Sequence, residues 1–135
     1  MIEIKPVEEI SACLPLLDGL QAEGGVFVLA ARDGELLAGA GALRLLDGYA
    51  VIERIATAPG FEVLDYAIGK ALLNFIERRE VLDVVCSRAE LIPVLRRLGF
   101  TEGKQLPEAA ADFAGDGVWY LNLEGYFTSH CHAQQ

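Results

Sequence analysis

Apolar residues in the first half of the chain form short continuous runs separated by turn-forming pairs. Three such runs occupy residues 26–32, 36–45 and 49–57. Asp33-Gly34 and Asp47-Gly48 separate them, and Asp-Gly between apolar runs is typical of a two-residue type I′ hairpin. The pattern therefore predicts a meander of three antiparallel strands.

Three other segments have apolar residues at helical spacing. The first covers residues 7–20, where Pro15 must kink the helix or split it into short turns. The second covers residues 66–79 and has one apolar face. The third follows Ser87-Arg88-Ala89-Glu90, which matches a capping box, and ends before Gly99, a residue that can adopt the left-handed conformation there.

Short strands complete the predicted order. Ile2 and Ile4 alternate with polar residues before Pro6, residues 82–86 form a buried strand, and residues 118–123 form the last strand. Because a helix leads into the strand at 82–86, we expect this strand to run parallel to its neighbour. The order predicts an α+β domain with one mixed central sheet flanked by helices, over residues 1–125, and a tail over residues 126–135.

Composition narrows the kind of protein. A chain of 135 residues that is 53% hydrophobic is one domain with ample core, and no apolar run reaches membrane-spanning length. No signal peptide is visible, and three cysteines without CxxC spacing favour a reducing cytoplasm. The net charge of −9 argues against nucleic acid or an anionic membrane as partner and suits a cationic or amine substrate.

Two motifs resemble the acyl-CoA-binding half of the GNAT N-acyltransferases. One is Ile52-Glu53-Arg54-Ile55-Ala56-Thr57-Ala58-Pro59, followed by Ala67-Ile68-Gly69-Lys70-Ala71-Leu72-Leu73; the other is Val94-Leu95-Arg96-Arg97-Leu98-Gly99-Phe100. The resemblance covers nearly the whole chain, and the predicted order of elements is the order in this family. It implies acetyl-CoA as acyl donor and a small amine as acceptor.

The resemblance also implies which residues bind the donor. The strand positions that match the pantetheine-binding main chain are Ile55, Ala56 and Thr57. The positions that match the pyrophosphate turn are Ala67, Ile68, Gly69 and Lys70, where N–H groups at a helix start bind anions. Ser87 completes the set of candidate donor-binding residues.

Several positions depart from the family pattern. Leu64 stands where Arg or Gln is usual, Ala67 where Gly is usual, and Leu95 where a Tyr serves as general acid. Leu cannot donate a proton, so Cys86, Ser87 and Tyr66 are the candidate substitutes, although each also has a structural use. The leaving thiolate can also take its proton from water.

The loop before the long helix carries two acids and no base. Glu62 and Asp65 would weaken coenzyme A binding unless their carboxylates point away from the phosphates, and Lys70 is the local cation in sequence.

Glu53 is the candidate catalytic residue. It lies two residues before Ile55, so we expect both side chains on one face of the strand, and a strand carboxylate there can deprotonate an amine directly or through water. The alternatives are an ion pair with Arg44 or exposure to solvent.

The C-terminal third suggests further properties. Four acids after Lys104 predict an acceptor with an additional positive charge, unless they only keep a loop soluble: Glu108, Asp112, Asp116 and Glu124. His130-Cys131-His132 fits a tail better than a zinc site, and we predict no metal. The sequence does not decide whether the chain forms a homodimer.

A second hypothesis for the function stands beside the acyltransferase. It is a non-catalytic GNAT-like module that binds acyl-CoA or another protein.

Overall fold

The computed structural model describes residues 1–20, 24–113 and 117–127. A seven-stranded mixed sheet has the order β1-β2-β3-β4-β5-β7-β6. The strands are β1 (Ile2–Pro6), β2 (Val26–Asp33), β3 (Leu36–Leu45), β4 (Ala50–Thr57), β5 (Asp83–Cys86), β6 (Thr101–Glu102) and β7 (Trp119–Asn122). The helices are α1 (Asp65–Arg78) and α2 (Ile92–Leu98), with 3-10 turns η1 (Ile10–Ala12), η2 (Glu62–Leu64), η3 (Ala89–Leu91) and η4 (Glu108–Ala110). No helix in these described ranges is long and apolar enough to cross a membrane.

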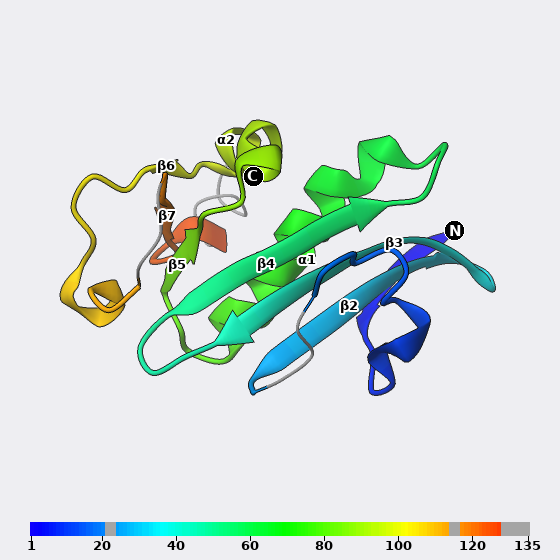
Figure 1. Cartoon of the computed structure of the whole chain (residues 1–135), viewed down its shortest axis with the longest axis horizontal. Coiled ribbons are helices and arrows are strands. Elements are labelled where there is room, and N and C mark those ends of the chain that lie inside the picture. Colours follow the sequence, from blue (N-terminus) through cyan, green and yellow to red (C-terminus); the bar gives the residue numbers. More distant parts are fainter. Residues whose placement is uncertain (21–23, 114–116, 128–135) are drawn as a thin grey trace.

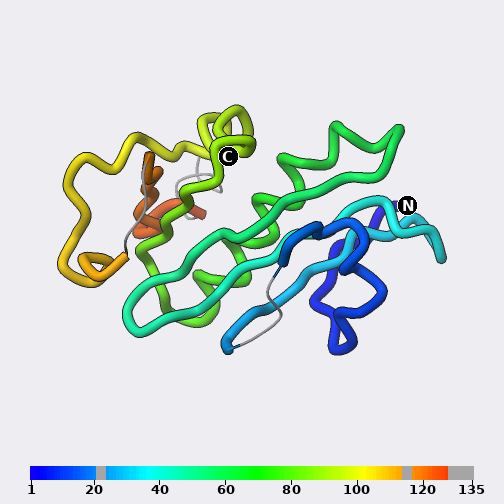
Figure 2. Tube along the Cα trace, viewed as in Figure 1, coloured from blue at the N-terminus to red at the C-terminus, as the bar shows by residue number. Residues whose placement is uncertain are grey.

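The predicted fold class, the three-strand meander and the long helix are confirmed. The sheet has two faces, which we call the helix face and the front face. The helix face carries Leu29, Leu43 and Ile52 and packs against α1 and α2. The front face carries Val28 and Ala42, which pack with the segment that contains η1. Figures 1 and 2 show α1 behind β3 and β4 and the segment with η1 in front of β2 and β3.

Close contact between α1 and the sheet depends on two glycines of β3. A Cβ added to Gly39 or Gly41 would lie 2.7 Å from a side-chain carbon of Ile68. Ile68 and Leu72 of α1 are fully buried over this strand. The absence of side chains at these two positions lets the helix lie flat on the sheet.

The sheet consists of two parts that are joined over a short distance. β1 to β4 are antiparallel neighbours, and β5, β7 and β6 form the second part. β4 and β5 are parallel, as predicted, but they pair only at Ala50 with Val84 and at Val51 with Val85. Beyond Val51 the two strands separate (Figure 1). A split therefore opens in the sheet between the rest of β4 and the end of β5.

Two local predictions were wrong, and of two alternatives for a third segment the second was confirmed. Pro15 splits residues 7–20 into the 3-10 turn η1 and further turns instead of kinking a helix, because it supplies no N–H and the segment is held by burial of Cys13 and Leu17 on the front face. Both hairpins form, but neither turn is type I′, because Glu80 is the one non-glycine residue with positive φ among the described residues. The side chain of Ser87 forms no cap, and η3 begins after Arg88 instead.

Other local features of the C-terminal third can be compared with the prediction. Gly99 ends α2 with φ of 103°, as predicted. β6, two residues long, directly follows Phe100, the aromatic after Gly99 at which a new strand was expected to start. Tyr126 and Phe127 pack against the main core, so the packed part of the chain extends two residues past the predicted boundary at 125. The remaining tail residues, with His130, Cys131 and His132, lie outside the described residues.

Candidate active site

The split between β4 and β5 exposes one side of the candidate donor-binding strand. Ile55, Ala56 and Thr57 pair with Gly41, Ala40 and Gly39 of β3 on one side. On the side of β5 no strand pairs with them in the described structure, and all three residues are half-buried. Their main chain can therefore accept an extended ligand, as the resemblance implies.

β4 contains one extra residue, and this residue is Glu53. Ala42 of β3 pairs with Arg54 and the next residue, Leu43, pairs with Ile52, so Glu53 has no partner of its own. Ile52 and Ile55 both pack against the core of the helix face. The bulge thus interrupts the alternation of side chains. Glu53 lies on the front face, and the expectation that it shares a face with Ile55 was wrong.

An ion pair holds the side chain of Glu53. Its Oε1 lies 3.2 Å from Nε of Arg44, and Nη1 of Arg44 also donates to the carbonyl of Gly24 at 2.6 Å. The Glu53 side chain remains 24% exposed, and that of Arg44 21%. The structure therefore contains the ion pair between Glu53 and Arg44 that the sequence left as one alternative. The carboxylate is still accessible to solvent, on the part of β4 that does not pair with β5.

Two carboxylates around the start of α1, those of Glu62 and Asp65, bind main-chain N–H groups next to them. The Gly60 N–H donates to Oε2 of Glu62 at 2.6 Å, and the Tyr66 N–H donates to Oδ1 of Asp65 at 2.7 Å. Oδ1 of Asp65 also lies 3.4 Å from Nη1 of Arg97. Neither acid points away from the loop. A phosphate that approached these N–H groups would have to displace both carboxylates.

The expected pyrophosphate turn, Ala67 to Lys70, lies entirely inside α1. The helix begins at Asp65, so Ala67 is exposed in the first turn, whereas Ile68 and Gly69 are buried in the second. A Cβ on Gly69 would lie 2.6 Å from Cδ1 of Leu98, so this glycine lets α2 approach α1. The structure gives Ile68 and Gly69 packing roles, and the N–H groups at the helix start belong to residues before them.

Two basic side chains, those of Lys70 and Arg97, lie close to the start of α1. Nζ of Lys70 lies 4.5 Å from the ring centroid of Tyr126 and 5.3 Å from that of Phe127, and burial lowers its pKa. Arg97 of α2 pairs with Asp65, the first residue of α1. Sequence reasoning missed Arg97 because it lies on α2, and only the packing of α2 against α1 brings it to Asp65.

The candidate proton donors differ in their surroundings. Leu95 is fully buried in the core and offers no proton. Burial raises the pKa of the Cys86 thiol to about 11, so it stays protonated at neutral pH. Ser87, half-buried, follows Cys86 at the end of β5 beside the split, and the ring of Tyr66 lies 4.9 Å from the Arg97 guanidinium. Within the described ranges, no three His, Cys, Asp or Glu side chains are grouped to hold a metal ion.

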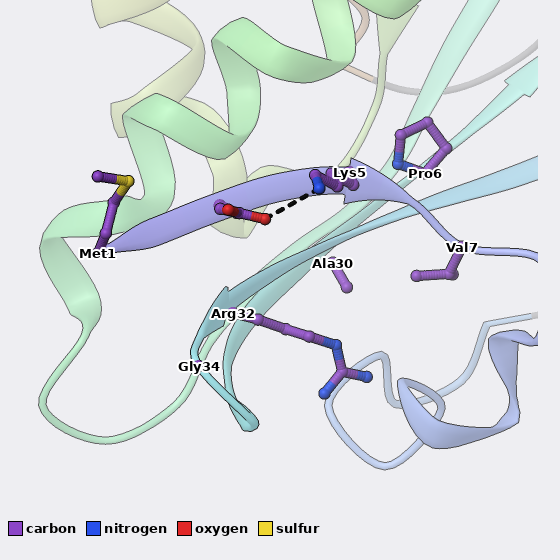
Figure 3. Close-up of a pocket in the computed structure, with 8 residues that line it drawn as sticks. Met1, Lys5, Pro6, Val7, Ala30, Arg32 and Gly34 are labelled. Carbon is purple, nitrogen blue, oxygen red and sulfur yellow. Dashed lines mark ion pairs between the residues drawn. The ribbon is translucent and has the colours of Figure 1, made fainter.

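A hollow of about 510 Å³ lies away from this site. Met1, Glu3, Lys5 and Arg32 are among the residues that line it, on the front face at the β1 edge (Figure 3). It therefore adds nothing to the candidate active site, which rests on the split and on Glu53.

Comparisons with known proteins agree with the architecture. No family model matches the sequence, and no curated protein matches it. A putative acyl-CoA N-acyltransferase from Klebsiella pneumoniae is similar in structure, with a TM-score of 0.71, 18% identity and coverage of 91% of this chain and 98% of that one. A GNAT family acetyltransferase from Elizabethkingia anophelis with acetyl-CoA bound gives a TM-score of 0.67 at 17% identity, over 90% of this chain and 98% of its own.

The ribosomal-protein-S18-alanine N-acetyltransferase of Escherichia coli has a TM-score of 0.66 at 18% identity, over 90% of this chain and 94% of its own. These likenesses show that the chain has the fold of the GNAT N-acetyltransferases, as its motifs predicted.

Proposed function

We propose that this protein is an acyl-CoA-dependent N-acyltransferase that transfers an acetyl group to a small amine. The observation that carries the proposal is the split beside Glu53: unpaired main chain of β4 faces the split, and a carboxylate stands on the adjoining open part of the same strand. This arrangement can place a thioester and an amine close to one base. The acetyl-CoA-bound structure of the same fold supports acetyl-CoA as the donor.

The proposed chemistry uses few groups. Glu53 takes a proton from the ammonium, directly or through water, and the amine nitrogen then attacks the thioester carbonyl carbon. The Ala58 N–H donates to the Ala38 carbonyl, so Ala56 also directs its main chain toward β3, whereas Ile55 and Thr57 direct theirs toward the split. The N–H groups of Ile55 and Thr57 polarise the carbonyl oxygen. The carbon–sulfur bond breaks, the nitrogen loses its remaining excess proton to water as the amide forms, and the thiolate takes a proton from water, since Leu95 has none to give. Arg44 orients the Glu53 carboxylate.

The main chain of β4 is better suited to bind the acyl donor than the N–H groups before and at the start of α1. The strand offers main chain that no strand pairs on the side of β5, whereas the N–H groups of Gly60 in the loop and of Tyr66 in α1 already donate to carboxylates. Glu62 is exposed, so its side chain is free to rotate away from the loop. We therefore propose that donor binding displaces Glu62 from the Gly60 N–H.

The acceptor is proposed to carry a positive charge besides the reacting amine. Glu108 and Asp112 are exposed near η4, in the segment that packs over β5 and β7, and Glu124 is exposed after β7. Acids of one sign along a site concentrate ligands of the opposite sign. Asp116 lies outside the described residues. The free, buried thiols of Cys13 and Cys86 support a reducing, cytoplasmic setting.

Glu53→Gln tests the proposed base. We expect the acyl-transfer rate to fall by about 10²-fold or more, while the dissociation constant for acetyl-CoA stays nearly unchanged. Glu35→Gln, at an exposed acid in the turn between β2 and β3, removes the same charge without changing the ion pair of Glu53 with Arg44, and it serves as the control. Equal rates for wild type and Glu53→Gln from pH 6 to 9 would remove Glu53 from the mechanism.

A second candidate function is a non-catalytic module of the same fold. The loop carboxylates that occupy their own N–H groups and the buried Leu95 favour it. Titration calorimetry with acetyl-CoA, followed by an acceptor screen, separates the two. Binding without turnover would indicate an acyl-CoA sensor, and no binding at millimolar acetyl-CoA would exclude the enzyme.

A further inference from the structure

β1 is an edge strand whose free side presents main-chain groups. The Val7 N–H donates to the Val28 carbonyl at 3.0 Å, so Lys5 and Glu3, two and four residues earlier, also direct their main chain toward β2. Ile2, Ile4 and Pro6 therefore direct theirs toward the free edge. Pro6 has no N–H, which suits an outward position. An edge of this kind can pair with a further strand.

Neither face of the sheet is fully covered beside this edge. On the front face lies the hollow of Figure 3, which Glu3 and Lys5 line. On the helix face a second hollow, of about 350 Å³, is lined by Ile4, Leu29 and Phe75 among others. Open space therefore lies beside β1 on both faces of the sheet.

The side chains of β1 are complementary to themselves under two-fold symmetry. Glu3 and Lys5 lie one residue on either side of Ile4 and form an ion pair of 3.0 Å within the strand. If a second β1 lies antiparallel with the symmetry axis at Ile4, Glu3 stands opposite the partner's Lys5, and Lys5 stands opposite the partner's Glu3. A two-fold interface needs this kind of self-complementarity.

We propose that β1 pairs with β1 of a second copy of this chain, antiparallel and centred on Ile4. The two Ile4 residues exchange N–H and carbonyl as a hydrogen-bonded pair, and each Ile2 N–H donates to the Pro6 carbonyl of the other copy. The missing N–H of Pro6 ends the ladder there. The charged pairs occupy non-hydrogen-bonded positions, where opposite Cα atoms are about 4.5 Å apart and side chains are closest.

Charge also fixes the register of this pairing. Moving the symmetry axis from Ile4 to Glu3 places the two Glu3 side chains opposite each other. Moving it to Lys5 does the same with the two lysines. Like charges directly opposite destabilise a strand pair, and opposite charges stabilise it. In the register centred on Ile4, opposite charges face each other and the full length of β1 is paired. The split beside β4 lies elsewhere in the sheet and stays accessible.

Single charge reversals test the pairing. We expect sedimentation equilibrium to show a dimer of the wild-type chain, and Glu3→Lys or Lys5→Glu to raise the dimer dissociation constant by about tenfold or more, because two attractive pairs become repulsive in each case. Lys104→Glu, which changes the net charge as Lys5→Glu does but at an exposed site after β6, serves as the control for that variant and should dimerise like the wild type. Circular dichroism verifies that each variant is folded.

A mixture of the two variants gives the decisive result. Glu3→Lys and Lys5→Glu chains together place unlike charges opposite each other between chains, although neither chain regains its internal Glu3–Lys5 pair. We expect the mixture to form heterodimers about as stable as the wild-type dimer. A wild-type chain that stays monomeric at millimolar concentration, single variants that dimerise like the wild type, or a mixture that stays monomeric would each overturn the proposal.

Discussion

Glu62→Ala should tighten acetyl-CoA binding. In the wild type, Oε2 of Glu62 accepts the Gly60 N–H at 2.6 Å, so a phosphate oxygen can use this donor only after the carboxylate leaves. An exposed hydrogen bond of this type is worth about 1 kcal/mol, which corresponds to about fivefold in the dissociation constant. Removing one negative charge about 6 Å from a phosphate adds roughly 0.7 kcal/mol in water. The two effects together predict tightening by about 15-fold to 20-fold.

Glu62→Gln separates the two contributions. The amide oxygen of Gln can still accept the Gly60 N–H, so this variant removes the charge alone and should tighten binding by about threefold. Isothermal titration at low and high salt measures both, because salt screens the contribution of the charge. Glu102→Ala, an exposed acid on β6, is the control for net charge. Binding by Glu62→Ala that is equal to or weaker than that of the wild type would refute the reasoning.

Further outcomes concern packing, pH and charge. Gly69→Ala should lower the free energy of unfolding in denaturant by about 1–3 kcal/mol, and by less in a Leu98→Ala background, because the new Cβ would lie 2.6 Å from Cδ1 of Leu98. The raised pKa of Cys86, about 11 instead of 9.0, means that the folded state holds the thiol proton more tightly than the unfolded state. Stability should therefore fall between pH 9 and 11 by about 2–3 kcal/mol, and Cys86→Ala should remove that part of the pH dependence. Glu108→Gln with Asp112→Asn should lower kcat/KM for cationic acceptors a few-fold at low salt and leave neutral acceptors unchanged.

Local signals made the meander predictable. Each hairpin needs only an apolar run, a turn pair and a second apolar run, all close in sequence, so Asp33-Gly34 and Asp47-Gly48 place the strands correctly. The turn types were wrong because type I′ needs positive φ at both central residues, whereas Glu35, beside Gly34, and Asp47, beside Gly48, keep negative φ. In residues 7–20, by contrast, the local pattern of apolar residues was misleading. Their apolar spacing suggests a helix, but Pro15 breaks it, and burial of Cys13 and Leu17 is achieved without one.

The candidate site was predictable only in part. The strand segment from Ile55 to Thr57 was identified because motifs there are local. The bulge at Glu53 was not, because a shift in register depends on hydrogen bonds with β3 that no local pattern encodes. The pair of Asp65 with Arg97 depends on how α2 packs on α1. Predictions from the sequence therefore fail where a side chain's position is decided by a contact between distant elements.

The short junction between β4 and β5 has a consequence for how a bound donor would be detected. Two register pairs connect the two parts of the sheet, and the packing of α2 on α1 at Gly69 also joins them. A molecule that fills the split would bridge both parts, as an inserted strand would. Amide hydrogens of Val84 and Val85 in β5 should then exchange with solvent more slowly in the presence of acetyl-CoA, whereas those of β1, at the far edge, should exchange at an unchanged rate.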